Sequence, residues 1–113
     1  MNEKRVVRNI EIPGINGKKV ICDVYGVKPI NLELGLRPAV IFLHGGGFVA
    51  GDKDQFLGMA ALLALEEDIL CITVQYRLAT EATCPSQIID CYSVCNWLLH
   101  KQKTFSVNPE LIF

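Results

Sequence analysis

Three consecutive glycines follow a histidine in the run His44-Gly45-Gly46-Gly47. Because glycine has no side chain, the backbone N–H groups of such a turn are able to approach a substrate atom closely. Two N–H groups that point at one oxygen form an oxyanion hole, which stabilises the charge developing in acyl transfer by about 2.7–4 kcal/mol per donor. Gly45, Gly46 and Gly47 are therefore candidate oxyanion-hole residues, and acyl transfer is the chemistry that the run favours.

The same loop also fits a dinucleotide-binding pattern, G-x-G-x-x-A, at Gly45, Gly47 and Ala50. A nucleotide site of that kind needs an acidic residue about 20 residues further on, near the end of the next strand. The next apolar run ends in Val-Gln-Tyr at Tyr76, and the acidic residues closest to it, at positions 66–68, come before that run. The sequence therefore disfavours a nucleotide cofactor.

Other side chains with catalytic potential lack suitable neighbours along the chain. His44 and His100 have no nucleophile or orienting carboxylate at a recognisable spacing, so both are expected to be structural or solvated. Ser86, Ser93 and Ser106 do not lie in a glycine-flanked turn of the type that exposes a nucleophile. None of these residues is a good candidate for the nucleophile or the general base.

Composition narrows the class of protein further. Half of the 113 residues are hydrophobic and 20% are charged, as in folded globular chains. The net charge of −1 argues against nucleic acid or an anionic membrane surface as the main partner. Five cysteines without a C-x-x-C pair, accompanied by two histidines, favour reduced and mostly buried thiols over a zinc site. No apolar run has the roughly 20 residues of a membrane span, and no signal peptide is recognisable, so a cytoplasmic protein is expected.

Apolar patterning predicts the elements that position the glycine run. Residues 1–27 contain two β-like runs joined by Asn16-Gly17, which is typical of an antiparallel hairpin. Residues 38–113 alternate strands and helices, with continuous apolar runs from Ala39 to Leu43 and at positions 69–76. Such runs predict strands buried on both faces of a parallel sheet. The C-terminal residues 111–113 resemble the first half of another buried strand.

Two helices are expected between these strands. Residues 55–66 are apolar nearly all round, which predicts a well-buried helix, and Asp52 is its expected N-cap with Gln55 in the capping-box position. The second helix begins near Pro85 and continues to about Lys103. Its apolar residues recur at helical spacing: Ile88, Tyr92, Cys95 and Leu99. The resulting order, β-β-β-α-β-α-β, implies right-handed crossovers and an α/β fold.

Three segments together resemble the hormone-sensitive-lipase-like group of α/β-hydrolases, which includes arylacetamide deacetylases and plant carboxylesterases. They are the segment from Pro38 to Phe48 with its His-Gly-Gly-Gly run, the segment Tyr76-Arg77-Leu78-Ala79-Thr80-Glu81, and Cys84-Pro85-Ser86 with Asp90 and Trp97. In addition, Asn108-Pro109-Glu110-Leu111-Ile112 is similar to the lead into the family's fifth strand. The resemblance covers residues 38–113 and extends loosely to the hairpin.

The resemblance implies that residues 1–113 are a partial α/β-hydrolase domain, the N-terminal part of its sheet. It implies hydrolysis of small-molecule esters or amides through an acyl-enzyme, with neither a metal nor an organic cofactor. Gly46 and Gly47 match the family's glycines whose N–H groups bind the oxyanion, and Gly45 matches the glycine that shapes the turn. Four other residues match structural positions of the family: His44, Tyr76, Arg77 and Asp90. Of these, Arg77 and Asp90 are expected to pair.

The family's catalytic triad has no counterpart in these 113 residues. Its Gly-x-Ser-x-Gly nucleophile elbow is expected within about ten residues after Phe113, and the acid and histidine later still. The chain alone is therefore expected to be inactive. An alternative is a short, non-catalytic interaction protein. With the fifth strand cut to about three residues, the strand from Ala39 to Leu43 is expected to form an exposed edge that self-associates or pairs with a homologous hydrolase.

Overall fold

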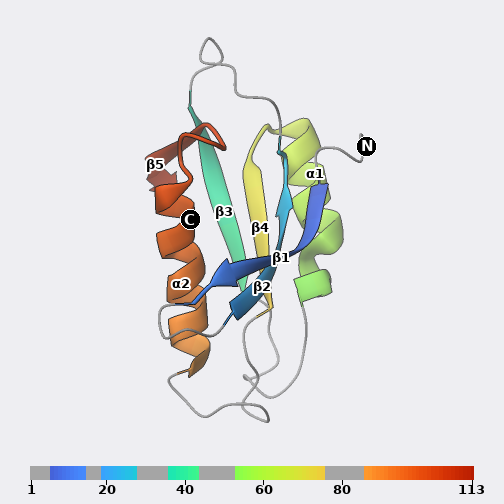
Figure 1. Cartoon of the computed structure of the whole chain (residues 1–113). Coiled ribbons are helices and arrows are strands. Elements are labelled where there is room, and N and C mark those ends of the chain that lie inside the picture. Colours follow the sequence, from blue (N-terminus) through green and yellow to red (C-terminus); the bar gives the residue numbers. More distant parts are fainter. Residues whose placement is uncertain (1–5, 15–18, 28–35, 44–52, 76–85) are drawn as a thin grey trace.

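The computed structural model describes residues 6–14, 19–27, 36–43, 53–75 and 86–113, which form a sheet with a helix on each face (Figure 1). Its elements, in chain order, are β1 (Val6–Pro13), β2 (Lys19–Tyr25), β3 (Arg37–Leu43), the 3₁₀ turn η3 (Lys53–Phe56), α1 (Leu57–Glu66), β4 (Leu70–Gln75), α2 (Ser86–His100) and β5 (Val107–Ile112). The predicted order of strands and helices is confirmed. None of the described helices is long and apolar enough to cross a membrane.

The sheet is mixed, with the strand order β1-β2-β4-β3-β5. β1 and β2 form the predicted antiparallel hairpin, and β2 also pairs antiparallel with β4. β3 pairs parallel with β4 on one side and with β5 on the other. The α/β class predicted from the alternation of apolar runs is therefore confirmed, and β3, the strand that precedes the glycine run in the sequence, occupies an interior position.

The two faces of the sheet carry separate parts of the hydrophobic core. Along β4, Ile72 and Val74 pack on the α2 side together with Val94 and Leu98 of the helix. Cys71, which precedes Ile72 in the strand, packs instead on the α1 side. Successive strand residues point to opposite faces. Burial on both faces explains why β4 has a continuous apolar sequence in place of an alternating one.

The prediction that the first helix is well buried is wrong. The buried residues of α1 are two alanines, Ala60 and Ala64, and Leu63 is partly buried against the same cluster. Its other large apolar side chains are between 38% and 59% exposed: Leu57, Met59, Leu62 and Leu65. Small side chains let the helix lie close to β4. The positions of small residues along α1, more than the positions of hydrophobic ones, therefore determine which face packs on the sheet. The predicted N-cap, Asp52, is wrong for α1: Asp52 itself lies outside the described residues, and the helix begins after Phe56, whose side chain forms no capping hydrogen bond.

α2 has the predicted helical spacing, but its apolar stripe faces away from the sheet. Ile88 and Tyr92 are 61% and 62% exposed, and Leu99 is also exposed. The buried side mixes polar and apolar residues: Gln87, Asp90, Ser93, Val94 and Leu98. The helix ends at His100, three residues before the predicted end at Lys103, and a turn leads from it into β5.

The prediction that β3 forms a free edge from Ala39 to Leu43 is wrong over the first half of that run. β5 begins at Val107, four residues earlier than predicted, and its ladder covers this side of β3. The Phe113 N–H donates to the Ala39 carbonyl at 2.9 Å, and the Ile41 N–H donates to the Phe113 carbonyl at 2.7 Å. Within the described residues, the outermost strand on this side is β5.

A buried arginine at the start of β3 ties two turns together. The Arg37 guanidinium donates to the Phe105 carbonyl from Nε at 3.1 Å and from Nη2 at 2.9 Å. Its Nη1 lies 3.5 Å from a carboxylate oxygen of Asp68. Phe105 precedes β5 and Asp68 precedes β4, so Arg37 holds the beginnings of three neighbouring parallel strands at one end of the sheet.

Candidate active site

Two of the three segments that carry the family resemblance follow strands that end at the same side of the sheet. β3 and β4 are parallel, and Leu43 at the end of β3 is paired with Val74 near the end of β4. The glycine run at 44–47 follows Leu43 directly, and Tyr76 follows the last residue of β4. In α/β sheets, ligands bind outside the carboxyl ends of the strands. The strands that precede both segments therefore end on the side of the sheet where a site is expected.

Most of the predicted site residues lie outside the described residues: His44, Gly45, Gly46, Gly47, Tyr76 and Arg77. Asp90 is described, and it lies on the buried side of α2 with 2% of its surface exposed. A carboxylate with so little contact with water needs compensating partners. Its burial fits a structural role, while its pairing with Arg77 stays a prediction.

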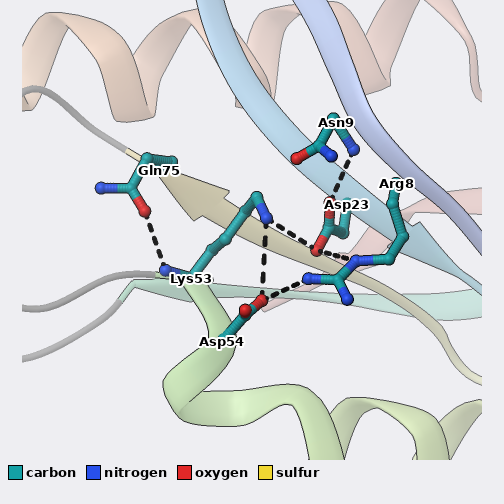
Figure 2. A network of polar contacts seen from close by, with 6 residues as sticks. All are labelled: Arg8, Asn9, Asp23, Lys53, Asp54 and Gln75. Carbon is teal, nitrogen blue, oxygen red and sulfur yellow. Dashed lines mark hydrogen bonds and ion pairs between the residues drawn. The ribbon is translucent and has the colours of Figure 1, made fainter.

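A buried carboxylate lies beside this edge, on the β2 strand (Figure 2). The Asp23 side chain is fully buried and accepts a hydrogen bond from the Asn9 backbone N–H at 2.7 Å. It also lies 3.2 Å from Arg8 Nε and 3.2 Å from Lys53 Nζ. Two cations and a backbone donor together compensate for the loss of water around the carboxylate.

A bulge in β1 turns two of these donors toward Asp23. The register between β1 and β2 shifts between Val7 and Ile10, and Asn9 has a positive φ of 57°. An extra residue in one strand leaves its N–H without a ladder partner and re-aims the neighbouring side chains. In this bulge the unpaired N–H of Asn9 and the guanidinium of Arg8 both point at the Asp23 carboxylate (Figure 2).

The same network fixes the segment that follows the glycine run. The Lys53 backbone N–H donates to Gln75 Oε1 at 3.0 Å, which joins the start of η3 to the last residue of β4. Asp54, the next residue, forms an ion pair with Arg8, and its carboxylate lies 3.7 Å from Lys53 Nζ. The chain between Leu43 and Lys53 therefore starts and ends at the carboxyl end of β4.

Local sequence patterns do not predict Asp23 and Lys53 as site residues. The available signal is an acidic residue inside the apolar strand Val20 to Tyr25, where a charge requires a partner. Its cations lie 15 and 30 positions away in the sequence, so their identity becomes clear only from the fold.

Charges and burial in this region shift the pKa values of two further groups. The pKa of the Arg8 guanidinium is raised, mainly by the negative charge of Asp23. The pKa of the Tyr25 phenol is raised, first by burial and then by Asp23. The Tyr25 hydroxyl lies near that of Thr73, but neither buried atom has a hydrogen bond of standard geometry within the described part of the chain.

The described thiols and histidine show no features of a nucleophile or base. Burial raises the pKa of Cys22 to about 12 and that of Cys71 and Cys91 to about 11, so these thiols stay protonated at neutral pH. The exposed His100 ring bonds to the Asn96 carbonyl in the last turn of α2. Ser93 donates its hydroxyl to the Ile89 carbonyl. In the described residues no three His, Cys, Asp or Glu side chains cluster as metal ligands.

Comparison with known proteins gives a consistent result. The family described as alpha/beta hydrolase fold matches residues 40–113. Esterase LipI of Mycobacterium tuberculosis is 39% identical over 61 residues, which are 54% of this chain and 19% of that protein. Tuliposide A-converting enzyme 2, chloroplastic, from Tulipa gesneriana is 30% identical over 109 residues, 88% of this chain and 28% of the enzyme.

Solved structures agree with these relatives. A Pyrobaculum calidifontis esterase superposes with a TM-score of 0.78 at 32% identity, over 96% of this chain and 33% of the esterase. EstE1, a thermostable carboxylesterase from a metagenomic library, gives 0.79 at 29% identity, over 95% of this chain and 34% of its own. The chain spans between about a fifth and a third of the lengths of these relatives. The family match covers most of the chain, so this protein belongs to the α/β-hydrolase fold family, with hormone-sensitive-lipase-like carboxylesterases as its relatives.

Proposed function

We propose that this chain is the part of a serine carboxylesterase that supplies the oxyanion hole. The observation that carries the proposal is the position of the glycine run, directly after the interior strand β3 in an α/β-hydrolase sheet. A carbonyl oxygen bound outside the strand ends would be within reach of backbone N–H groups from Gly46 and Gly47. Gly45 shapes the turn between them and β3.

The proposed chemistry is acyl transfer to a serine. When the serine oxygen attacks an ester carbonyl, the carbonyl oxygen gains a full negative charge in the tetrahedral intermediate. N–H donors that are already oriented toward that oxygen stabilise this charge more strongly than that of the ground state, which accelerates the step. His44, Tyr76, Arg77 and Asp90 hold the loops around the site, and no cofactor takes part.

Small-molecule esters or amides are the proposed substrates, and the cytoplasm is the proposed location. The serine, acid and histidine of the triad are proposed to come from family segments that this chain does not match. Without these three residues a serine hydrolase loses about 10⁶ in kcat. The 113-residue chain by itself is therefore expected to be inactive.

The experiment compares two proteins: the 113-residue chain and the product of the longest natural reading frame that contains it. Both are assayed with p-nitrophenyl acetate and butyrate and with a fluorophosphonate probe, which labels activated serines. We expect hydrolysis and labelling for the longer product, and neither for the 113-residue chain. An unlabelled longer product without hydrolysis would contradict the proposal, and so would hydrolysis by the short chain.

A second candidate function is a non-catalytic interaction protein. The observation in its favour is the apolar surface at one side of the sheet, where Phe113 is 71% exposed and Leu111 is also exposed. β5, the outermost described strand there, would offer its free edge to a partner strand. Co-purification of a larger homologous hydrolase with the chain supports this function, and a lone monomer on size exclusion counts against it.

A further inference from the structure

The buried carboxylate of Asp23 holds Lys53, the first described residue after the glycine run. We propose that Asp23 is a positioning residue for the oxyanion loop, acting through Lys53. The inference rests on the proposed function, because the loop matters only if Gly46 and Gly47 bind an oxyanion. Asp23 itself does not touch the substrate.

The contacts of Asp23 support a role beyond ordinary packing. Its carboxylate is fully buried and lies 3.2 Å from Lys53 Nζ, whose side chain is only 11% exposed. The neighbouring charges balance, since Arg8 and Lys53 are positive and Asp23 and Asp54 are negative. A buried ion pair with additional hydrogen bonds gives little net stability but selects one arrangement of its partners. Asp23 therefore fixes where Lys53 lies.

The position of Lys53 matters because the intervening segment is short. Nine residues, 44–52, connect Leu43 to Lys53, and the three glycines come within the first four of them. Leu43 is held in the β3–β4 ladder, and Lys53 is held twice: its backbone by Gln75 and its side chain by Asp23. The proposed role of Asp23 is that a displacement of Lys53 shifts the glycines, which are at most eight residues away in the sequence. Misplacement of a catalytic group by about 1 Å can lower the reaction rate on the order of 10²-fold.

The two contacts of Lys53 are separable by substitution. Lys53→Met keeps the backbone N–H that donates to Gln75 but removes the ammonium that pairs with Asp23. Lys53→Arg retains a cation that can reach the carboxylate. Asp23 keeps Arg8 and Asn9 as partners in Lys53→Met, so this variant avoids an uncompensated buried charge. Asp23→Asn removes the charge itself and is the more disruptive variant.

The test measures backbone order parameters of Gly45, Gly46 and Gly47 by ¹⁵N NMR relaxation on the 113-residue chain. Order parameters describe the folded population, so a uniform loss of stability does not change them. On a scale where about 0.85 is rigid and below 0.6 is flexible, we expect the glycine values to fall by about 0.2 in Asp23→Asn and in Lys53→Met. Lys53→Arg is expected to keep the values of the unmodified chain.

The matched control is Glu11→Gln, which removes an exposed carboxylate from the ion pair with Lys19 on the same hairpin. It is expected to leave the glycines unchanged. Glycine order parameters that stay unchanged in Lys53→Met would overturn the positioning role of Asp23, whether or not the longer enzyme hydrolyses esters. Equal losses in Lys53→Arg and Lys53→Met would also overturn it, because the charge would then be irrelevant. Failure of the esterase assay alone would overturn the proposed function and leave the structural link from Asp23 to the loop intact.

Discussion

Replacing Arg37 by methionine is expected to destabilise the fold by about 2–3 kcal/mol. The Arg37 side chain is only 6% exposed, and its guanidinium donates two hydrogen bonds to the Phe105 carbonyl, at 3.1 and 2.9 Å. Both donors share one acceptor, so we count them together as one hydrogen bond that involves a charged group, which contributes about 1.5–3 kcal/mol. The contact with Asp68 adds less than about 1 kcal/mol, because that carboxylate is 60% exposed and its partner lies 3.5 Å away. Methionine preserves the apolar stem of the side chain, so the loss reflects the polar contacts.

The assay is urea unfolding at pH 7, followed by far-UV circular dichroism, for the unmodified chain, Arg37→Met and Arg37→Lys. Lysine keeps the charge but not the planar fork, so an intermediate loss is expected. Lys19→Met is the matched control, since it removes a cation from an exposed ion pair and is expected to change the stability by less than about 0.5 kcal/mol. A change of less than about 0.5 kcal/mol for Arg37→Met would refute the argument that this guanidinium joins the turns before β4 and β5.

Three further predictions concern backbone and thiol chemistry. Gly26→Ala is expected to cost more than about 1 kcal/mol of unfolding free energy, because φ is +93° and a Cβ would lie 3.2 Å from Arg37 Nη1. By contrast, Gly58→Ala in α1 meets nothing within 4 Å and is expected to stabilise by about 0.5 kcal/mol in the same urea assay. Because the pKa of Cys22 is raised from 9.0 to about 12 in the fold, its contribution to stability is complete below pH 9 and declines toward pH 12 by about 1.4 kcal/mol per pH unit. Urea midpoints between pH 8 and 11 are expected to fall less steeply for Cys22→Val, and an unchanged slope would contradict this assignment.

Continuous apolar runs predict both interior strands, although only β4 is buried on both faces. In β3, Arg37 and Ala39 are buried, while the side chains from Val40 to Leu43 are partly or largely exposed. The apolar runs do not predict which side of each helix packs. The apolar residues of α1 lie all around the helix, and the ones that become buried are Ala60 and Ala64, whose small size permits close approach. In α2 the regular stripe through Ile88 and Tyr92 is exposed, because the buried side includes polar residues that periodicity does not identify.

Local sequence patterns also fail to predict where β5 begins. Asn108 and Pro109 are typical strand breakers, yet they lie within the strand. Proline has no N–H to donate to a ladder and is tolerated where one side of a strand is unpaired. β5 is the outermost described strand, so the missing donor costs little there. The position of a strand in its sheet depends on residues far away in the sequence, so a local pattern does not predict it.

The candidate site also has one part that the sequence predicts and another that it does not. The glycine run and its place after a buried strand follow from sequence, because both are local. The anchoring by Asp23 depends on a bulge at Asn9 and on Lys53, which the fold brings from 30 positions further along the chain. Charge pairs between segments that are distant in the sequence can be identified only from the three-dimensional arrangement of the strands.

Sequencing the transcript past the codon for Phe113 tests the central claim most directly. The proposed esterase predicts an open frame that completes a strand and reads Gly-x-Ser-x-Gly within about ten residues, with an Asp and a His further on. A stop codon directly after Phe113, together with a natural protein mass near 12.5 kDa, would contradict the esterase function for this product.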